Sequence, residues 1–270
     1  MTDKRLVAPI GIGSGSLVAL SAKPATDLIV FVHGFKGSAR STWDDFIGAI
    51  QPSASLDLLF YGYNSRPSRL QSLAYQFRQD MLSLLTLDVR SFLTPTVVGY
   101  LEERDGELPR EAGLHFVAHS LGTVIVRRAL IDCLRSEDDS QFRKLTPRSK
   151  LFFAPAHKGS DITKLWGTVL SQLPINLDSV LQIAYPVLRD LQPNCASLNE
   201  LITDYHALQE HDQRTATASR IVTGSEDAVV EQQKFGDDPV TEYVAGRNHR
   251  DICKPTAAYP DPVDKLYQTI

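Results

Sequence analysis

Three side chains that together support nucleophilic catalysis occur in a defined order along the chain: Ser120, then Asp227, then His249. A serine hydroxyl attacks carbonyl carbons poorly at neutral pH unless a histidine removes its proton and a carboxylate orients that histidine. Ser120 lies in the stretch FVAHSLGTV (116–124), with alanine two positions before it and glycine two positions after it. Small residues at both positions let two backbones cross at a tight turn, so the stretch indicates a nucleophilic serine.

The pentapeptide around Ser120 is weak evidence by itself, because so loose a pattern is expected by chance in roughly one chain of this length in five. Its surroundings are more specific. LHFVA (114–118) is typical of a short buried strand, and apolar residues at helical spacing follow from Leu121 to about Leu134. Ser120 is therefore predicted at a strand-to-helix junction, where a nucleophile is exposed. The alternative is that its side chain only caps the helix.

The acid and the base are expected in the loops after two later strands. SRIVTG (219–224) is typical of a buried strand, and Asp227 lies in the loop that follows, with Glu226 as the competing carboxylate. TEYVAG (241–246) is typical of the last strand, and His249 follows it. Turns favour such polar residues for purely structural reasons. Their common order, each past the carboxyl end of a strand, favours a complete Ser-Asp-His triad.

The loop after LIVFV (28–32) is expected to complete the site. The backbone N–H of Leu121, at the start of the helix, is predicted to stabilise an oxyanion, and that of Phe35 is predicted to be the second donor. His33 in the same loop is better suited to fix the loop by hydrogen bonding than to act as the base. Three histidines are candidates for contact with a substrate: His33, His119 and His157.

Strands and helices are predicted to alternate, which is typical of an α/β sheet with right-handed crossovers. The pattern is apolar and continuous in the strands and recurs every three to four residues in the helices. The remaining predicted elements are strands at 56–63 and 150–154 and helices at 42–50 and 70–84. Residues 86–112 are weakly patterned, and the sequence predicts no element there.

The segment 161–214 interrupts this alternation. It is rich in leucine and isoleucine and contains three prolines. We expect a helical cap over the active site, because the segment leaves the sheet on the side where the strands end. The alternative is a group of packed surface helices without a functional role.

The composition limits the classes of function. The chain has 270 residues, 43% hydrophobic and 22% charged, which suits a single domain spanning 1–270. Its 28 basic and 32 acidic residues give a net charge of −4, and no block of Lys and Arg indicates a nucleic-acid partner. Because Cys133, Cys195 and Cys253 lack metal-ligand spacing, we expect reduced thiols in a cytoplasmic protein, with no metal and no cofactor.

The first 22 residues allow two interpretations. An apolar stretch followed by the small residues Ser21 and Ala22 is similar to a cleaved signal peptide, which would make the protein secreted. The stretch is broken by Pro9, by glycines and by serines, so we favour an edge hairpin that leads into the first core strand. No segment approaches the roughly 18 consecutive apolar residues of a membrane span.

Several stretches of the sequence match the motifs of one enzyme superfamily. The chain resembles the α/β-hydrolase superfamily of serine esterases and lipases, and within it the group that includes the GPI inositol-deacylase. The resemblance covers nearly the whole chain and is weakest in 161–214. The matching stretches are FVHGFKGS (31–38), STW (41–43), YGYNS (61–65), AHSLGTVIVRRAL (118–130), FFAPAHKGS (152–160), GSEDAVV (224–230) and NHRDICKP (248–255).

The resemblance implies the α/β-hydrolase fold, with a mostly parallel central sheet, helices on both faces and a helical cap insertion. It also implies a role for each candidate residue, in agreement with the order of elements. Ser120 would be the nucleophile, Asp227 the acid and His249 the base. The backbone N–H groups of Phe35 and Leu121 would form the oxyanion hole.

We therefore expect a serine hydrolase that cleaves carboxylic esters through an acyl-enzyme and needs no cofactor. The apolar insertion favours a lipid or other acyl ester as substrate and allows peripheral contact with a membrane. The same triad would serve an acyltransferase or an amidase. A non-catalytic or partner-regulated module on a hydrolase scaffold is the alternative from a different class.

Overall fold

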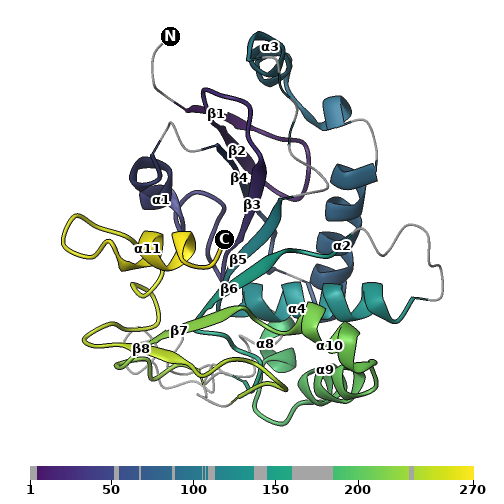
Figure 1. Cartoon of the computed structure of the whole chain (residues 1–270). Coiled ribbons are helices and arrows are strands. Elements are labelled where there is room, and N and C mark those ends of the chain that lie inside the picture. Colours follow the sequence, from purple (N-terminus) through teal and green to yellow (C-terminus); the bar gives the residue numbers. More distant parts are fainter. Residues whose placement is uncertain are drawn as a thin grey trace.

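An eight-stranded sheet forms the centre of the molecule (Figure 1). The computed structural model describes residues 5–51, 55–66, 68–86, 89–104, 106, 108, 113–136, 145–159, 185–230 and 234–270. Within these residues the strands lie in the order β1-β2-β4-β3-β5-β6-β7-β8. They are β1 (Leu6–Pro9), β2 (Leu17–Leu20), β3 (Asp27–Val32), β4 (Leu56–Tyr61), β5 (Leu114–His119), β6 (Ser149–Phe153), β7 (Arg220–Gly224) and β8 (Glu242–Val244).

The sheet is parallel from β4 to β8 and antiparallel at the edge formed by β1 and β2. β2 pairs with both β1 and β4, with Val18 opposite Leu59. The predicted edge hairpin is thus confirmed, and residues 6–20 belong to the sheet. A mostly parallel sheet brings the carboxyl ends of its strands to one edge, where the loops that follow them meet.

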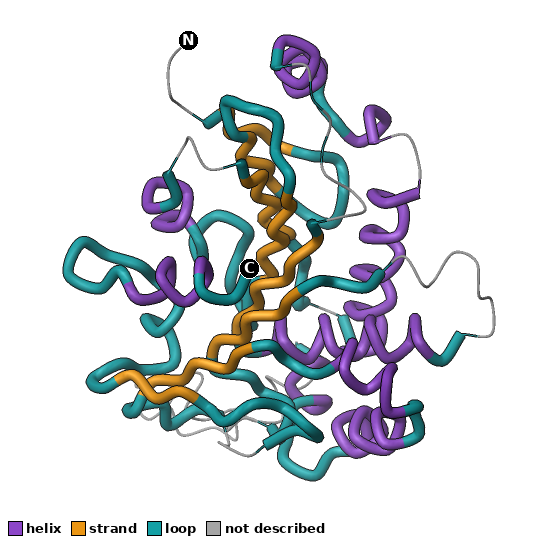
Figure 2. The backbone as a smooth tube through the Cα atoms, in the orientation of Figure 1, coloured by secondary structure: helices purple, strands orange, loops and turns teal. Residues whose placement is uncertain are grey.

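Helices cover both faces of the sheet (Figure 2). The helices α1 (Asp44–Ala49) and α11 (Asp261–Tyr267) lie on one face. On the other face, α2 (Leu70–Thr86) packs beside α4 (Leu121–Leu134). This layering confirms the predicted α/β class, and the predicted helices at 42–50 and 70–84 correspond to α1 and α2.

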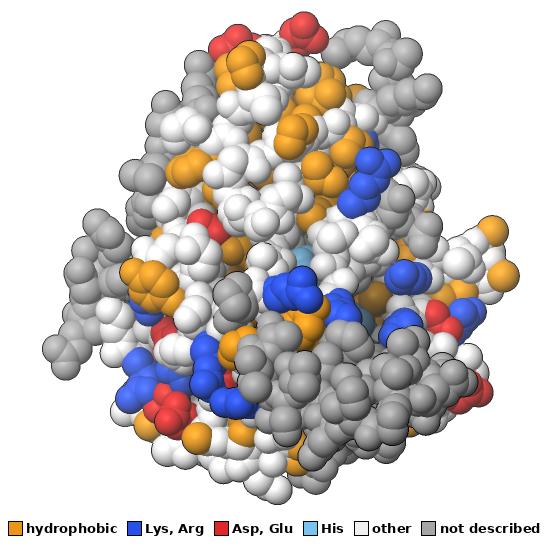
Figure 3. Space-filling model, turned by 180° about the vertical axis from the view of Figure 1, so that it is seen from behind, with side chains coloured by type: hydrophobic (Ala, Val, Ile, Leu, Met, Phe, Trp, Pro, Cys, Tyr) orange, Lys and Arg blue, Asp and Glu red, His pale blue; other side chains and the backbone are white. Residues whose placement is uncertain are grey.

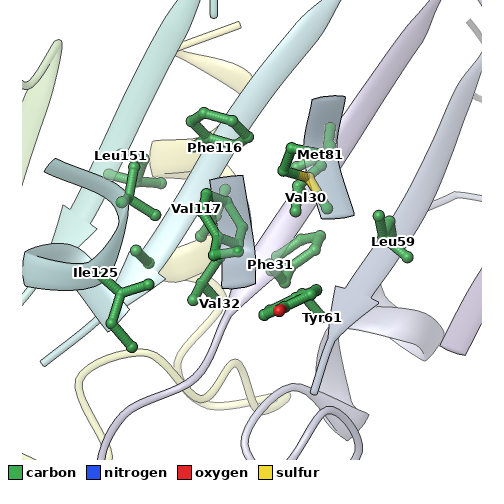
Figure 4. Close-up of a cluster of buried hydrophobic side chains, with 14 of the residues drawn as sticks. Val30, Phe31, Val32, Leu59, Tyr61, Met81, Phe116, Val117, Ile125 and Leu151 are labelled. Atoms are coloured by element: carbon green, nitrogen blue, oxygen red, sulfur yellow. The ribbon is translucent and has the colours of Figure 1, made fainter. Parts of the chain in front are cut away.

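The core lies on both faces of the central strands. β3 and β5 are buried along almost their whole length, which explains their continuous apolar sequences. Phe31 of β3 stacks on Phe60 of β4 with ring centroids 4.8 Å apart, and Phe46 of α1 packs on the same ring. Figure 4 shows Met81 and Ile125 among the side chains that cluster around these strands.

The strand β4 ends at Tyr61, two residues earlier than the predicted segment 56–63. The backbone N–H of Gly62 donates to the Ser16 hydroxyl at 2.9 Å, and that of Tyr63 donates to His33 Nε2 at 3.3 Å. The chain therefore leaves the sheet because side chains replace the neighbouring strand as acceptors. Tyr63 instead contacts His33, in the loop that follows β3.

Two of the described α-helices were not predicted from the sequence. The helix α3 (Pro95–Glu103) lies in the weakly patterned segment, where Thr94 accepts a hydrogen bond from the N–H of Val97 and Pro95 occupies the first turn. Threonine before proline is a recognisable helix start, so this signal was present. The other missed helix, α11, also begins next to a proline.

The predicted cap at 161–214 lies partly outside the described residues, which resume at Tyr185. The later part forms α8 (Val187–Asp190), α9 (Ala196–His206) and α10 (Glu210–Ala216). The last two pack on α4. The carboxylate of Asp190 accepts a hydrogen bond from the N–H of Leu70 at the start of α2 (2.8 Å) and pairs with Arg69 (3.1 Å). The cap therefore stays a prediction.

Candidate active site

Ser120 occupies the turn between β5 and α4, as predicted. Its backbone has φ 52° and ψ −121°, a conformation that costs free energy for any residue with a Cβ atom and is concentrated at functional sites. Backbone and side-chain hydrogen bonds hold the turn. The N–H of Ser120 donates to the carbonyl of Phe153 at 3.0 Å, and the Thr123 hydroxyl donates to the Ser120 carbonyl at 2.7 Å.

The helix α4 crosses the end of β3 at very close range. A Cβ atom added to Gly122 would lie 2.4 Å from the carbonyl oxygen of Val32 and 2.5 Å from that of His33. Both neighbours are backbone atoms, so no side chain can move aside. Position 122 therefore requires glycine, whereas position 118 accommodates the fully buried Ala118. This geometry explains why alanine is accommodated two positions before Ser120 whereas glycine is needed two positions after it.

His249 lies directly against Ser120. Its Nε2 is 2.9 Å from Ser120 Oγ, although the two residues are 129 positions apart in the sequence. The loop that carries His249 is joined to the end of β7 by backbone hydrogen bonds, because Glu226 N–H donates to Arg247 O at 3.0 Å and Ser225 N–H donates to Val244 O at 2.9 Å.

Asp227 lies behind the histidine. Its Oδ2 is 2.8 Å from His249 Nδ1, and its side chain is 0% exposed. Because an ionised carboxylate only accepts hydrogen bonds, Nδ1 carries the proton and Nε2 is left to accept from the serine hydroxyl. The other carboxylate oxygen accepts from the N–H groups of Val229 (2.9 Å) and Val230 (3.4 Å).

The environment of Asp227 favours its ionised form. Burial by itself raises the pKa of this carboxyl, but the hydrogen bonds from His249 and from two backbone N–H groups outweigh burial and leave the pKa below its ordinary value. Glu226, the competing carboxylate, is exposed. The structure thus brings Ser120, His249 and Asp227 together and leaves Glu226 outside the hydrogen-bonded chain.

The positions predicted for oxyanion stabilisation adjoin Ser120. Leu121 is the first residue of α4, so its N–H has no acceptor within the helix. The loop after β3 runs against Ser120, since a Cβ atom on Gly34 would lie 3.0 Å from Ser120 Cβ. Phe35 follows in this loop, and it lines a pocket that Ser120 also lines. The backbone N–H groups of Leu121 and Phe35 therefore both lie close to Ser120.

His33 holds the loop after β3 in place. The ring Nδ1–H donates to the Gly34 carbonyl at 2.8 Å, Nε2 accepts from the N–H of Tyr63, and the ring stacks on that of Tyr63 at 4.1 Å. The side chain is buried and does not line the pocket. This arrangement agrees with the expectation that His33 fixes the loop rather than acts as the base.

His119 and His157 occupy different surroundings. His119 lines the pocket, and its Nε2–H donates to the backbone carbonyl of His249 at 2.7 Å, so it ties β5 to the loop of the candidate base. His157 is buried against Phe235, with ring centroids 5.3 Å apart, and is not among the described residues that line the pocket. Substrate contact by either residue stays a prediction.

Burial of neutral histidines makes the stability of the fold sensitive to acid. Burial lowers the pKa of His33 to about 4 and, with the nearby His249, that of His119 to about 3, from an ordinary value of 6.5. Burial also lowers the pKa of His115. Below pH 6.5 these histidines therefore become protonated in the unfolded chain while they remain neutral in the folded protein. This contribution to stability is complete above pH 6.5 and is lost as the pH falls towards 4.

We expect the free energy of unfolding to fall by about 2 to 4 kcal/mol between pH 7 and pH 5, as measured by urea denaturation. The variant His119→Gln, which keeps an N–H donor but does not titrate, should have a shallower pH dependence. Replacement of the exposed His211 by Gln is the control and should leave the slope unchanged. A parent protein equally stable at both pH values would contradict the prediction.

A pocket of about 360 Å³ opens above Ser120. Its lining includes the hydroxyl side chains of Ser41 and Thr42, and it also includes three cations that the sequence analysis did not single out: Lys36, Arg250 and Lys254. In the sequence, Lys36 directly follows Phe35 and Arg250 directly follows His249, and both of those residues were predicted to belong to the site. Tyr185, where the described chain resumes, contacts the ring of Phe35 at 5.3 Å.

Within the described residues, no group of three or more His, Cys, Asp or Glu side chains is arranged to hold a metal ion. Cys133, Cys195 and Cys253 are free thiols, and the first and last of them are buried. None of the described helices combines the length and the apolar character needed to span a membrane.

No family model matches the sequence, and no curated protein matches it. Several solved structures are similar. The mature lipase BlEst2 from Bacillus licheniformis has a TM-score of 0.54 at 15% identity, over 99% of both chains. Phospholipase PlaB from Legionella pneumophila has a TM-score of 0.52 at 15% identity, over 90% of this chain and 58% of that one.

The peroxisomal alpha-beta-hydrolase Lpx1 from Saccharomyces cerevisiae has a TM-score of 0.52 at 9% identity, over 94% of this chain and 81% of that one. At such low identity the likeness concerns the fold. Together with the sheet order and its two helical layers, it shows that this chain has the α/β-hydrolase fold. The fold class predicted from the sequence is confirmed.

Proposed function

We propose that this protein is a serine hydrolase that cleaves carboxylic esters through an acyl-enzyme. One observation carries the proposal: Ser120, His249 and Asp227 form a continuous hydrogen-bonded chain that ends in a pocket. Fold alone does not assign a function, but this chain has the polarity that serine activation requires. The serine hydroxyl donates to a neutral imidazole nitrogen, and the opposite N–H of the ring donates to a carboxylate.

The reaction follows from this polarity. Ser120 Oγ attacks the ester carbonyl carbon while His249 Nε2 accepts the hydroxyl proton, and the carbonyl oxygen becomes an oxyanion. The N–H groups of Leu121 and Phe35 would donate to that oxyanion. His249 then protonates the departing alcohol, leaving an acyl-Ser120 ester. Water attacks this ester with His249 again as base, which releases the acid and restores the serine.

Asp227 assists without becoming protonated. Its ionised form is favoured by three hydrogen bonds, so it stabilises the imidazolium that forms when His249 accepts the proton. The hydrogen bond from His249 also fixes the imidazole tautomer with Nδ1 protonated. The fully buried position of the carboxylate keeps water from competing for these contacts.

The substrate is proposed to be a lipid or other acyl ester. Phe35 lines the pocket and contacts the ring of Tyr185, which belongs to the apolar segment 161–214. A cap formed by this segment would cover an acyl chain and allow peripheral membrane contact. BlEst2 is named a lipase and PlaB a phospholipase, which supports acyl esters as the class to test first.

Two narrower proposals concern relationship and location. The likeness to the GPI inositol-deacylase group rests on stretches that the fold gathers around the pocket, such as 31–38, 118–130 and 248–255. Residues 6–20 form two strands of the sheet, which favours a folded protein that retains this segment over cleavage after Ala22. The cytoplasmic location stays a prediction.

Reaction with an active-site-directed probe tests the proposal. A fluorophosphonate should label the folded protein once, and peptide mapping should find the adduct on Ser120, because only an activated serine attacks this phosphorus centre rapidly. The same preparation should hydrolyse p-nitrophenyl acyl esters, and prior labelling should abolish that activity. A folded protein that neither reacts nor hydrolyses esters would be a non-catalytic module, and the proposal would be wrong.

A further inference from the structure

The charge of the pocket differs from the charge of the protein. The whole chain has a net charge of −4, yet the ionised side chains along the pocket belong to Lys36, Arg250 and Lys254. No Asp or Glu is among the described residues that line it. Figure 3 shows Lys and Arg side chains gathered across the middle of one face, next to histidine atoms. A pocket of this kind favours anionic ligands.

The three cations approach Ser120 from two sides. Lys36 follows Phe35 in the loop after β3, at a left-handed backbone position with φ 56°. Arg250 and Lys254 come from the loop of the candidate base, directly after His249 and one turn later. An anion held between these two loops would lie beside the reacting hydroxyl rather than at a remote surface.

The cations also repel one another. The pKa of the Lys36 ammonium is lowered by partial burial, then by the positive charges of Arg66 and Arg250. The Lys36 Nζ and the Arg66 guanidinium both lie against the ring of Tyr185, at 5.4 and 4.9 Å from its centroid. A bound anion would relieve this repulsion, so the arrangement gains free energy from a negatively charged ligand.

Two carboxylates of the described residues lie close to the triad, and both are engaged in other contacts. Asp227 is fully buried behind His249 and is committed to the imidazole and to two backbone N–H groups. Asp251 accepts hydrogen bonds from the backbone and side-chain N–H groups of Asn248. Both carboxylates therefore organise the loop of the base, and neither lines the pocket.

We propose that this pocket selects esters whose acyl or alcohol part carries an anionic group, a phosphate or a carboxylate, held by Lys36, Arg250 and Lys254 beside Ser120. The inference rests on the proposed esterase function and specifies its substrate class. Only the ester bond breaks, as in the mechanism above, and the anionic group leaves unchanged with one of the two products. The same three cations would also attract an anionic membrane surface, and the experiment below distinguishes a membrane from an anionic substrate.

Two matched pairs of soluble esters test the proposal. On the alcohol side, dibutanoyl phosphatidic acid is compared with dibutanoylglycerol. On the acyl side, mono-p-nitrophenyl suberate is compared with p-nitrophenyl octanoate, all below their micelle-forming concentrations. In at least one pair we expect kcat/KM to be about tenfold higher for the anionic ester, with the ratio falling as salt is added. The responding pair identifies the part of the substrate that carries the charge.

Charge-removing variants locate the preference. Lys36→Gln, Arg250→Gln and Lys254→Gln should each lower the ratio of anionic to neutral kcat/KM, by up to about tenfold. Lys254→Arg keeps the charge and should keep the ratio. Arg214→Gln is the matched control, because this exposed arginine pairs with Glu210 on α10, away from the pocket lining.

The outcomes separate the inference from the function on which it rests. Equal kcat/KM for both members of both pairs, or an unchanged ratio in all three charge-removing variants, overturns the anion preference while the esterase function stands. A preference that appears only when substrate is presented in phosphatidylglycerol vesicles overturns it in favour of a membrane-binding surface. Cleavage of none of the four esters would overturn both proposals.

Discussion

Replacement of Ser120 by Ala is expected to lower kcat for ester hydrolysis by about 10⁶-fold, because the attacking atom is removed and only the surrounding donors remain. The alanine fits the same turn, since both residues have a Cβ atom and the hydroxyl that is removed forms a hydrogen bond with His249. The measurement is steady-state hydrolysis of p-nitrophenyl octanoate, with thermal unfolding recorded in parallel.

Ser136→Ala is the control for this prediction. Ser136 follows the far end of the same helix, α4, where its N–H donates to the Cys133 carbonyl. Its loss should leave kcat unchanged. If the Ser120 variant kept even a tenth of the parent activity, another residue would be the nucleophile and the assignment of the site would be wrong.

Replacement of Asp227 by Asn is expected to lower kcat by about 10⁴-fold with little change in KM. An amide at this position can donate a hydrogen bond to His249 Nδ1 and so stabilise the wrong tautomer, with the proton on Nε2. In that form the histidine cannot accept the proton of Ser120. The imidazolium would also lose its buried counter-charge. Burst and steady-state kinetics with a p-nitrophenyl ester measure the effect.

Glu226→Gln provides the matched comparison at the neighbouring position. Its side chain is exposed and lies outside the hydrogen-bonded chain, so activity should be close to that of the parent. The reverse result, with a strong loss at 226 and a weak one at 227, would show that the orientation of this loop differs in the active enzyme.

The sequence was most informative where the structure is set by short segments. The strand β5, the turn at Ser120 and the helix α4 follow one another without a gap, so apolar pattern and small residues were enough to predict the turn. The position of His249 followed from chain order and from the predicted strand just before it. Both kinds of signal lie within a few residues of the element that they predict.

The sequence favoured Asp227 through its place in the loop after β7 but left Glu226 as the competing carboxylate. Their backbone N–H groups have different acceptors after β7. That of Asp227 donates to the carbonyl of Gly224, whereas that of Glu226 donates to the carbonyl of Arg247 in the loop that carries His249. This choice depends on a contact between two loops 22 residues apart.

The charge of the pocket was invisible in the sequence for a related reason. Lys36, Arg250 and Lys254 belong to two loops that are more than 200 residues apart, and each stands in a stretch of ordinary composition. The overall charge of the chain even points the other way. Only the parallel sheet, which gathers the loops at one edge, brings the cations together.

The candidate catalytic residues follow different strands of the sheet, and this affects how catalytic activity would be lost. Ser120 follows β5, an interior strand with neighbours on both sides, whereas His249 follows β8, a three-residue strand at the edge. Edge elements open locally at a lower free energy than the interior. Brief detachment of β8 would remove the base from an otherwise folded protein, and the bond from His119 to the His249 carbonyl opposes this. Catalytic activity would thus be lost at a lower free energy than that of global unfolding.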